Sequence, residues 1–221
     1  MDDARLHAEA GAAEGTTCVA WRQHAGRGRA GRAWVSADGG TYVSVVVRPP
    51  PAQGGLFALA VGAAVTATIE AAGAPARLKW PNDVLMRDQK VAGVLIEASW
   101  GEAPFAIVGI GLNLTHAPLP EATSLAAVGV ADAADREAWA RRVAAAALTA
   151  AARVRTNPAA ALIDVQARCL NLGHRVAFEH QGTLIEGVGV DINADGALIV
   201  ELDDGNRVTV TAGDVGFVAK R

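Results

Sequence analysis

The chain has 221 residues, of which 51% are hydrophobic and 19% are charged, and its formal net charge is -3. This composition describes a globular protein with one sizeable core and a small appendage, and it excludes a disordered chain. The negative balance disfavours the diffuse electrostatic grip that nucleic-acid binders use. The two cysteines have no metal-ligand spacing and suit a reducing compartment. Because the acidic N-terminus does not resemble a signal peptide, we expect a cytoplasmic protein that binds neither DNA nor a membrane.

The first three quarters of the chain are predicted to alternate helices and strands. Residues 2–10 and 56–71 have helical character, the first with Gly11 as its C-cap. Strands are predicted at 16–21, 41–47, 91–97 and 105–114, and helices at 136–154 and 158–170.

From about residue 174 the predicted elements are short strands only. They cover 175–178, 183–190, 197–202 and 207–211, and Gly, Asn and Asp separate them at hairpin spacing. This pattern is typical of a small antiparallel β-barrel of SH3 size. We therefore predict an α+β protein whose first domain, residues 1–172, contains a mixed sheet and whose second domain is residues 173–221.

The most informative stretch is residues 26–32, which read Gly-Arg-Gly-Arg-Ala-Gly-Arg, with Trp34 just beyond. Glycine lets a ligand approach the backbone closely, and arginine supplies a planar, permanently charged fork of donors. Such a loop is expected to be mobile when empty and to close over an anion when occupied. Taken alone, this stretch is also consistent with a solvated basic loop.

Two further motifs come from the middle of the chain. Lys90 begins a hydrophobic β pattern in which Gly93 leaves room, so its ammonium can reach a ligand on the sheet, although most lysines at strand edges are simply solvated. Residues 79–83 read Lys-Trp-Pro-Asn-Asp. Their amide and carboxylate can bind a base edge and a cation, or the segment is an ordinary turn.

The last motif is Gly-Ile-Gly-Leu-Asn at residues 109–113. Its two glycines and its asparagine share one face of a strand, because strand side chains alternate. That face can accept a flat ligand, or it is a tightly packed corner of the sheet.

In this order the four motifs resemble the biotin protein ligases, that is, biotin–[acetyl-CoA carboxylase] ligases, which also end in a small SH3-like domain. The resemblance implies attachment of biotin to a lysine through biotinyl-5′-AMP, with ATP, biotin and Mg²⁺. The implied partner is the biotin carboxyl carrier domain of acetyl-CoA carboxylase or of another biotin-dependent carboxylase.

The resemblance also implies roles for individual residues. Lys90 and Arg29 match catalytic residues that neutralise the carboxylate and the α-phosphate as they meet. The residues that match biotin contacts are Gln23, Arg27, Gly28, Arg29, Lys90, Gly93 and Gly109. Those that match ATP contacts are Trp34, Asn82, Asn113, Arg32 and Lys79, and Asp83 matches a Mg²⁺ ligand.

The sequence departs from the family in two places. The family usually has a strand and a Ser-Thr-Asn motif before the helix that matches residues 2–10, and Met1 stands about where that Asn would be. We expect weaker biotin binding and an open sheet edge that favours a homodimer. Ala30 stands where many relatives have an arginine. Two alternatives stay open: a lipoate-type protein ligase with the same adenylate chemistry, and a truncated protein that binds biotin or the carrier without turnover.

Overall fold

A six-stranded sheet forms the centre of the computed structural model, which describes residues 1–36, 38–180 and 182–218. In spatial order its strands are β1 (Thr17–Ala20), β2 (Gly40–Val47), β6 (Phe105–Asn113), β5 (Gln89–Ser99), β4 (Asp83–Met86) and β3 (Arg77–Lys79). Neighbouring strands pair antiparallel. Isolated parallel bridges join Leu78 to Cys169 and Lys90 to Ala122. Because β1 is an edge strand, the predicted homodimer has a surface to use, and it stays a prediction.

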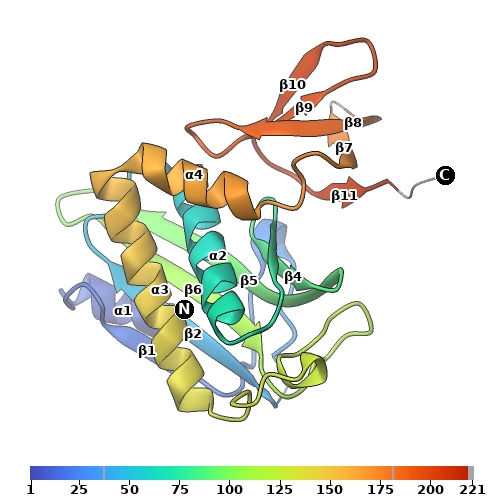
Figure 1. Ribbon diagram of the computed structural model, residues 1–221. Helices are drawn as coiled ribbons and strands as arrows, with labels where there is room; N and C mark the ends of the chain where they lie inside the picture. Colours follow the sequence, from blue (N-terminus) through green and yellow to red (C-terminus); the bar gives the residue numbers. More distant parts are fainter. Residues whose placement is uncertain (37, 181, 219–221) are drawn as a thin grey trace.

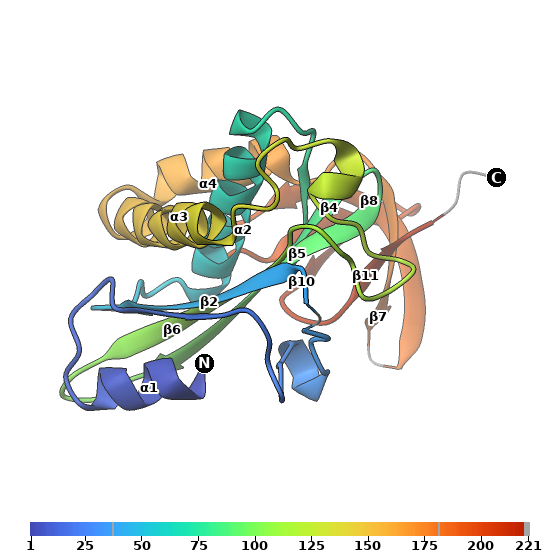
Figure 2. The ribbon, with the colours of Figure 1, turned by 90° about the horizontal axis from the view of Figure 1, so that it is seen from below.

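Helices cover both faces of this sheet (Figures 1 and 2). Helices α2 (Gly54–Ala71), α3 (Arg136–Thr156) and α4 (Pro158–Arg168) lie on one face, and α1 (Asp2–Glu9) lies on the other. Every residue of β2 is buried as a result, which explains why the sequence there is a continuous β-branched run rather than an alternating one.

Helix α2 is the most apolar of the four α-helices in the described residues. Its mean hydropathy of 1.6 over 18 residues is enough, by length and composition alone, for a membrane span. In the fold, 56% of it is buried. Phe57, Leu59 and Ile69 are at most 1% exposed, and they belong to the same hydrophobic cluster as strands β2, β5 and β6. Its hydrophobicity is therefore that of a core helix, which is apolar because it contacts neighbours on several sides.

The C-terminal part forms a second, five-stranded antiparallel sheet, at the top of Figure 1. Its order is β10 (Arg207–Val210), β9 (Leu198–Glu201), β8 (Thr183–Ile192), β7 (Arg175–His180) and β11 (Val215–Phe217). The predicted α+β class and the small SH3-like β-domain are confirmed. The sequence prediction missed the short strands β3, β4 and β11, and the boundary at 172/173 stays a prediction.

The beginning of α2 packs directly on the second sheet. A methyl group added to Gly55 would lie 2.3 Å from the carbonyl oxygen of Asp195, whereas one added to Gly54 would meet no atom within 4 Å. An alanine side chain at Gly55 would therefore clash with the second sheet's β8–β9 turn, whereas one at Gly54 would not.

We predict that Gly55→Ala destabilises the protein and that Gly54→Ala does not. Forcing a methyl group into a filled site costs about 1–3 kcal/mol, while alanine is a better helix residue than glycine by up to about 1 kcal/mol. Urea or thermal unfolding of the two variants beside the parent measures both effects. Equal stability of the two variants would contradict the close contact between α2 and the second sheet.

Candidate functional site

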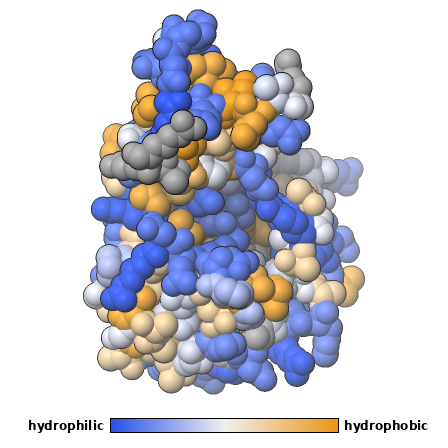
Figure 3. Space-filling model, turned by 90° about the vertical axis from the view of Figure 1, so that its right-hand side faces the viewer, coloured by the Kyte–Doolittle hydropathy of each residue, from blue (hydrophilic) through white to orange (hydrophobic). Residues whose placement is uncertain are grey.

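A cleft of about 540 Å³ opens between the six-stranded sheet, the segment of residues 26–32 (the arginine loop) and β11 of the second sheet. Figure 3 shows a hollowed face below the C-terminal strands, with hydrophilic side chains around the hollow. Most predicted site residues line this cleft: Gln23, Arg27, Gly28, Arg29, Arg32, Trp34, Lys79, Asn82, Asp83, Lys90, Gly93 and Gly109. Four motifs spread over 88 residues of sequence thus meet at one place.

Asn113 is the exception. It is 3% exposed and lies outside the cleft lining. Its Nδ2 donates a hydrogen bond of 3.1 Å to the carbonyl oxygen of Thr123. In the empty protein this bond anchors the chain segment that follows β6, and the contact of Asn113 with ATP stays a prediction. Motif position alone could not separate the two uses of the amide.

Two glycines opposite each other on β5 and β6 form the floor of the cleft. Gly93 pairs with Gly111, and the indole of Trp34 lies on both. A Cβ atom would come within 2.7 Å of the ring at Gly93 and within 2.6 Å at Gly111. Any side chain at either position would lift the ring off the sheet. Gly111 was in the predicted motif but not among the predicted site residues, because only the strand pairing shows that it completes the floor.

The Gly109 end of the floor is also covered. A Cβ atom on Gly109 would lie 2.7 Å from Sδ of Met1, so the side chain at the beginning of α1 lies against this glycine. Gln23 lines the same cleft, and its Oε1 accepts a hydrogen bond of 2.6 Å from the Ser36 hydroxyl. Tyr42 also lines the cleft, where burial raises the pKa of its phenol.

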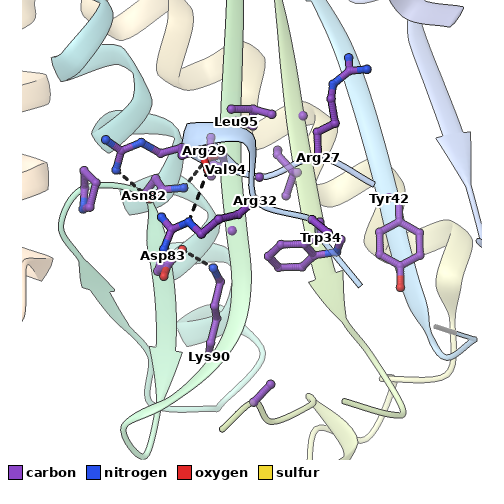
Figure 4. Close-up of a pocket in the computed structure, with 18 of the residues that line it drawn as sticks. Arg27, Arg29, Arg32, Trp34, Tyr42, Asn82, Asp83, Lys90, Val94 and Leu95 are labelled. Atoms are coloured by element: carbon purple, nitrogen blue, oxygen red, sulfur yellow. Dashed lines mark hydrogen bonds and ion pairs between the residues drawn. The ribbon is translucent and has the colours of Figure 1, made fainter. Parts of the chain in front are cut away.

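Lys90 stands at the edge of this floor. Its Nζ lies 2.6 Å from Oδ1 of Asp83 and 4.9 Å from the centre of the Trp34 ring (Figure 4). The β4–β5 pairing shifts register between Val84 and Leu85, and such an irregularity re-aims side chains. Trp34 thus has an ammonium against its face, a cation–π arrangement.

The arginine loop folds as a short hairpin. Backbone hydrogen bonds join Trp34 N to Gly26 O at 2.9 Å and Gly28 N to Arg32 O at 2.7 Å. Ala30, at its tip, has φ of 52°, a left-handed conformation that few residues other than glycine adopt. Figure 4 shows Arg29 directed toward Asn82.

The three arginines of the loop have different partners. Arg27 makes two hydrogen bonds to the Asp2 carboxylate, at 2.7 and 3.0 Å, and this pairing lowers the pKa of Asp2. Arg32 makes two bonds of 2.8 Å to Asp214 of the second sheet. Arg29, in contrast, donates to the amide oxygen of Asn82 at 3.3 Å. Burial lowers the pKa of Arg29, so a bound anion would relieve a half-buried charge.

The turn at residues 79–83 is held rigidly. Asn82 makes two hydrogen bonds to the backbone of Val94. Its side-chain Nδ2 donates to the Val94 carbonyl oxygen at 2.8 Å, and its backbone carbonyl oxygen accepts from the Val94 N–H at 2.9 Å. The Nζ of Lys79 lies 5.7 Å from the centre of the Phe217 ring on the second sheet. No local pattern in the sequence predicts that Asp214 and Phe217, more than 130 residues away, adjoin this turn.

The cleft fits anions better than a preformed metal site. Within the described residues, no group of three or more His, Cys, Asp or Glu side chains could hold a metal ion. Asp83 is a half-buried carboxylate in the cleft. Mg²⁺ is often held by one or two carboxylates together with substrate phosphates, so a single Asp is compatible with a cation that arrives with a nucleotide.

Family models match two parts of the chain. Residues 5–113 match the model of the biotin/lipoate A/B protein ligase family. Residues 172–218 match that of the biotin protein ligase C terminal domain. The second match distinguishes the chain from relatives that have only the shared ligase domain.

Individual relatives agree with these matches. The chain is 40% identical over 218 residues to the biotin–[acetyl-CoA-carboxylase] ligase of Mycobacterium tuberculosis, with 91% of this chain and 79% of the relative covered. It is 45% identical over 121 residues to the enzyme of that name from Paracoccus denitrificans, covering 48% of this chain and 49% of the relative.

Solved structures extend the likeness to nearly the whole chain. The biotin protein ligase of Aquifex aeolicus in complex with biotin and ATP has a TM-score of 0.80 and 27% identity, covering 98% of this chain and 94% of that one. The Leishmania major biotin protein ligase in complex with biotinyl-5-AMP has a TM-score of 0.55 and 25% identity, covering 96% and 94%.

The Lys90–Asp83 pair is predicted to stabilise the empty protein measurably. Its side chains are 34% and 24% exposed, whereas those of the helix pair Arg141–Glu137 are 71% and 75% exposed. A double-mutant cycle with Lys90→Met and Asp83→Asn should give a coupling energy of about 1 kcal/mol. The same cycle at Arg141 and Glu137 should give about 0.3 kcal/mol. Urea unfolding measures both, and equal coupling energies would refute the difference.

Proposed function

The chain belongs to the biotin protein ligase family, and we propose that the cleft is where it joins biotin to ATP. Its activity is that of an ATP-dependent biotin ligase. The observation that supports this location is the meeting of Lys90, Arg29 and the Trp34 ring over a floor without side chains. The match to a biotin protein ligase C terminal domain favours biotin over lipoate as the acid.

In the proposed first step, a carboxylate oxygen of biotin bonds to the α-phosphorus of ATP and pyrophosphate leaves. Two anions must come together, so the site needs positive charge that is already in place. Lys90 and Arg29 meet this need, because both are half-buried and project into the cleft. Fixed charges in a site that excludes water act more strongly than mobile ones in solution.

We assign the remaining residues by position along the floor. The biotin side comprises Gln23, Arg27, Gly28, Arg29, Lys90, Gly93 and Gly109, and the ATP side comprises Trp34, Arg32, Lys79, Asn82 and Asn113. Asp83 would hold Mg²⁺, which supplies positive charge to the leaving phosphates when bound. Because Asp83 pairs with Lys90 at 2.6 Å, the lysine must exchange this partner for the substrate anions.

In the second step, the amine of a carrier lysine attacks the acyl carbon and AMP leaves. The acceptor we propose is the biotin carboxyl carrier domain of acetyl-CoA carboxylase or of another biotin-dependent carboxylase. The arginine loop would shield the adenylate from water until the carrier docks. We place the reaction in the cytoplasm, where the free thiols of Cys18 and Cys169 are stable.

The test of the function is biotin-dependent exchange of labelled pyrophosphate into ATP, followed by transfer of biotin to a carrier domain detected by mass spectrometry. Lipoate offered in place of biotin distinguishes the two acids. Exchange with lipoate and none with biotin would overturn the proposal.

We predict that Lys90→Ala lowers the rate of exchange by about 10²–10³, because one fixed charge at the reacting groups is lost. Arg141→Ala, on the exposed face of α3, serves as the control and should keep the parental rate. Both variants should unfold cooperatively. A rate near that of the parent in Lys90→Ala would remove this lysine from the chemistry.

Arg29→Gly should release preformed biotinyl-adenylate about ten- to a hundredfold faster, since a charged hydrogen bond is worth about 1.5–3 kcal/mol. Arg22→Gly makes the same change at an exposed arginine outside the cleft lining and should leave the dissociation rate unchanged. Stopped-flow dissociation measures both. The same dissociation rate in Arg29→Gly and the parent would show that the loop is only a basic surface.

A further inference from the structure

The turn that carries Asn82 and Asp83 is held from behind by residues that lie outside the cleft. The backbone N–H of Trp80 donates a hydrogen bond of 2.7 Å to Oδ1 of Asn171. Asn171 is 0% exposed and precedes the second sheet. None of the four motifs includes this asparagine, and the cleft lining does not contain it.

Other contacts fix the same turn to the C-terminal part of the chain. The indole Nε1 of Trp80 donates to the carbonyl oxygen of Gly196 at 2.9 Å, and the N–H of Leu170 donates to the carbonyl oxygen of Leu78 at 2.8 Å. Trp80 is 1% exposed, so its backbone N–H has no access to water. Asn171 is therefore the partner that this donor requires.

The second polar atom of the Asn171 side chain, Nδ2, argues against a role in packing alone. Its Nδ2 is buried and has no hydrogen-bond partner among the described residues. A buried donor without a partner lowers stability, and an apolar side chain of similar volume would avoid that loss. What an apolar side chain cannot do is accept the Trp80 N–H.

We propose that Asn171 is a positioning residue for the ATP side of the site, acting through Trp80 on Asn82 and Asp83. The turn is then fixed at two points, by Asn171 behind Trp80 and by Val94 beside Asn82. Groups held in this way need no rearrangement when the nucleotide binds. This inference rests on the proposed function of the cleft.

The experiment compares three variants of the full chain in the pyrophosphate-exchange assay. Asn171→Leu removes the acceptor at similar volume, and Asn171→Asp keeps an oxygen in its place. Gln166→Ala is the matched control, because Gln166 also bonds across the junction, to Asp191 and Ile192, but does not touch the turn. Hydrogen exchange of the Trp80 amide is measured on each variant.

For Asn171→Leu we expect the KM for ATP to rise about tenfold with the KM for biotin unchanged, as loss of a buried hydrogen bond allows. Trp80 amide exchange should accelerate. Asn171→Asp should restore the KM for ATP to within about threefold of the parent, and Gln166→Ala should change neither constant. If Asn171→Leu does not fold, Asn171→Ser, whose hydroxyl is too short to replace Oδ1, takes its place.

An unchanged KM for ATP in the folded variant overturns the inference, and so does an equal rise in both KM values. If neither Asn171→Leu nor Asn171→Ser folds, the residue is purely structural and the inference again fails. An inactive parent chain, in contrast, would overturn the proposed function itself.

Discussion

The site depends on keeping one patch of a buried sheet free of side chains. Strands β5 and β6 are otherwise rich in branched residues, and they lose packing and β propensity where Gly93 meets Gly111. The sheet can accommodate this loss because helices α2 and α3 cover its opposite face. The result is a flat surface on which the Trp34 ring lies so close that a Cβ atom on either glycine would come within 2.7 Å of it. Because any Cβ there would meet that ring, the glycines are set by the site rather than by the fold.

The charges of the cleft are arranged around this floor in two classes. Arg27 and Arg32 form exposed pairs with Asp2 and Asp214, which are worth little and are screened by salt. An incoming anion can displace such partners at small cost. Lys90 and Arg29 are half-buried, so their charges act through a medium of lower dielectric constant. The exposed pairs therefore hold the loop only weakly, whereas Lys90 on β5 and Arg29, which bonds to Asn82, supply the stronger charges nearest the chemistry.

Much of the fold and most of the site could be predicted from the sequence, because local signals specify them. The dense β-branched run before Pro49 and the Pro158 that follows Asn157 identified β2 and α4 within two residues. Short elements such as β3 and β11, of three residues each, contain too few positions for any periodicity to show. Their existence depends on pairing with distant strands. The hydrogen bond from the Asn113 amide to Thr123 is visible only in the tertiary structure for a related reason, since its partner lies outside the motif.

Contacts with the second sheet explain why the motifs alone could not predict the whole site. A segment of fewer than 50 residues buries too little surface to be firmly stable by itself, and its buried side chains, including Val176 and Phe178, belong to the same cluster as the main core. It must therefore pack against the larger domain to be stable. The surface it uses is the back of the turn at residues 79–83, through Gly196, and the rim of the cleft, through Asp214 and Phe217. Packing that stabilises the small sheet thus also builds one wall of the cleft, which makes stability and site geometry a single constraint.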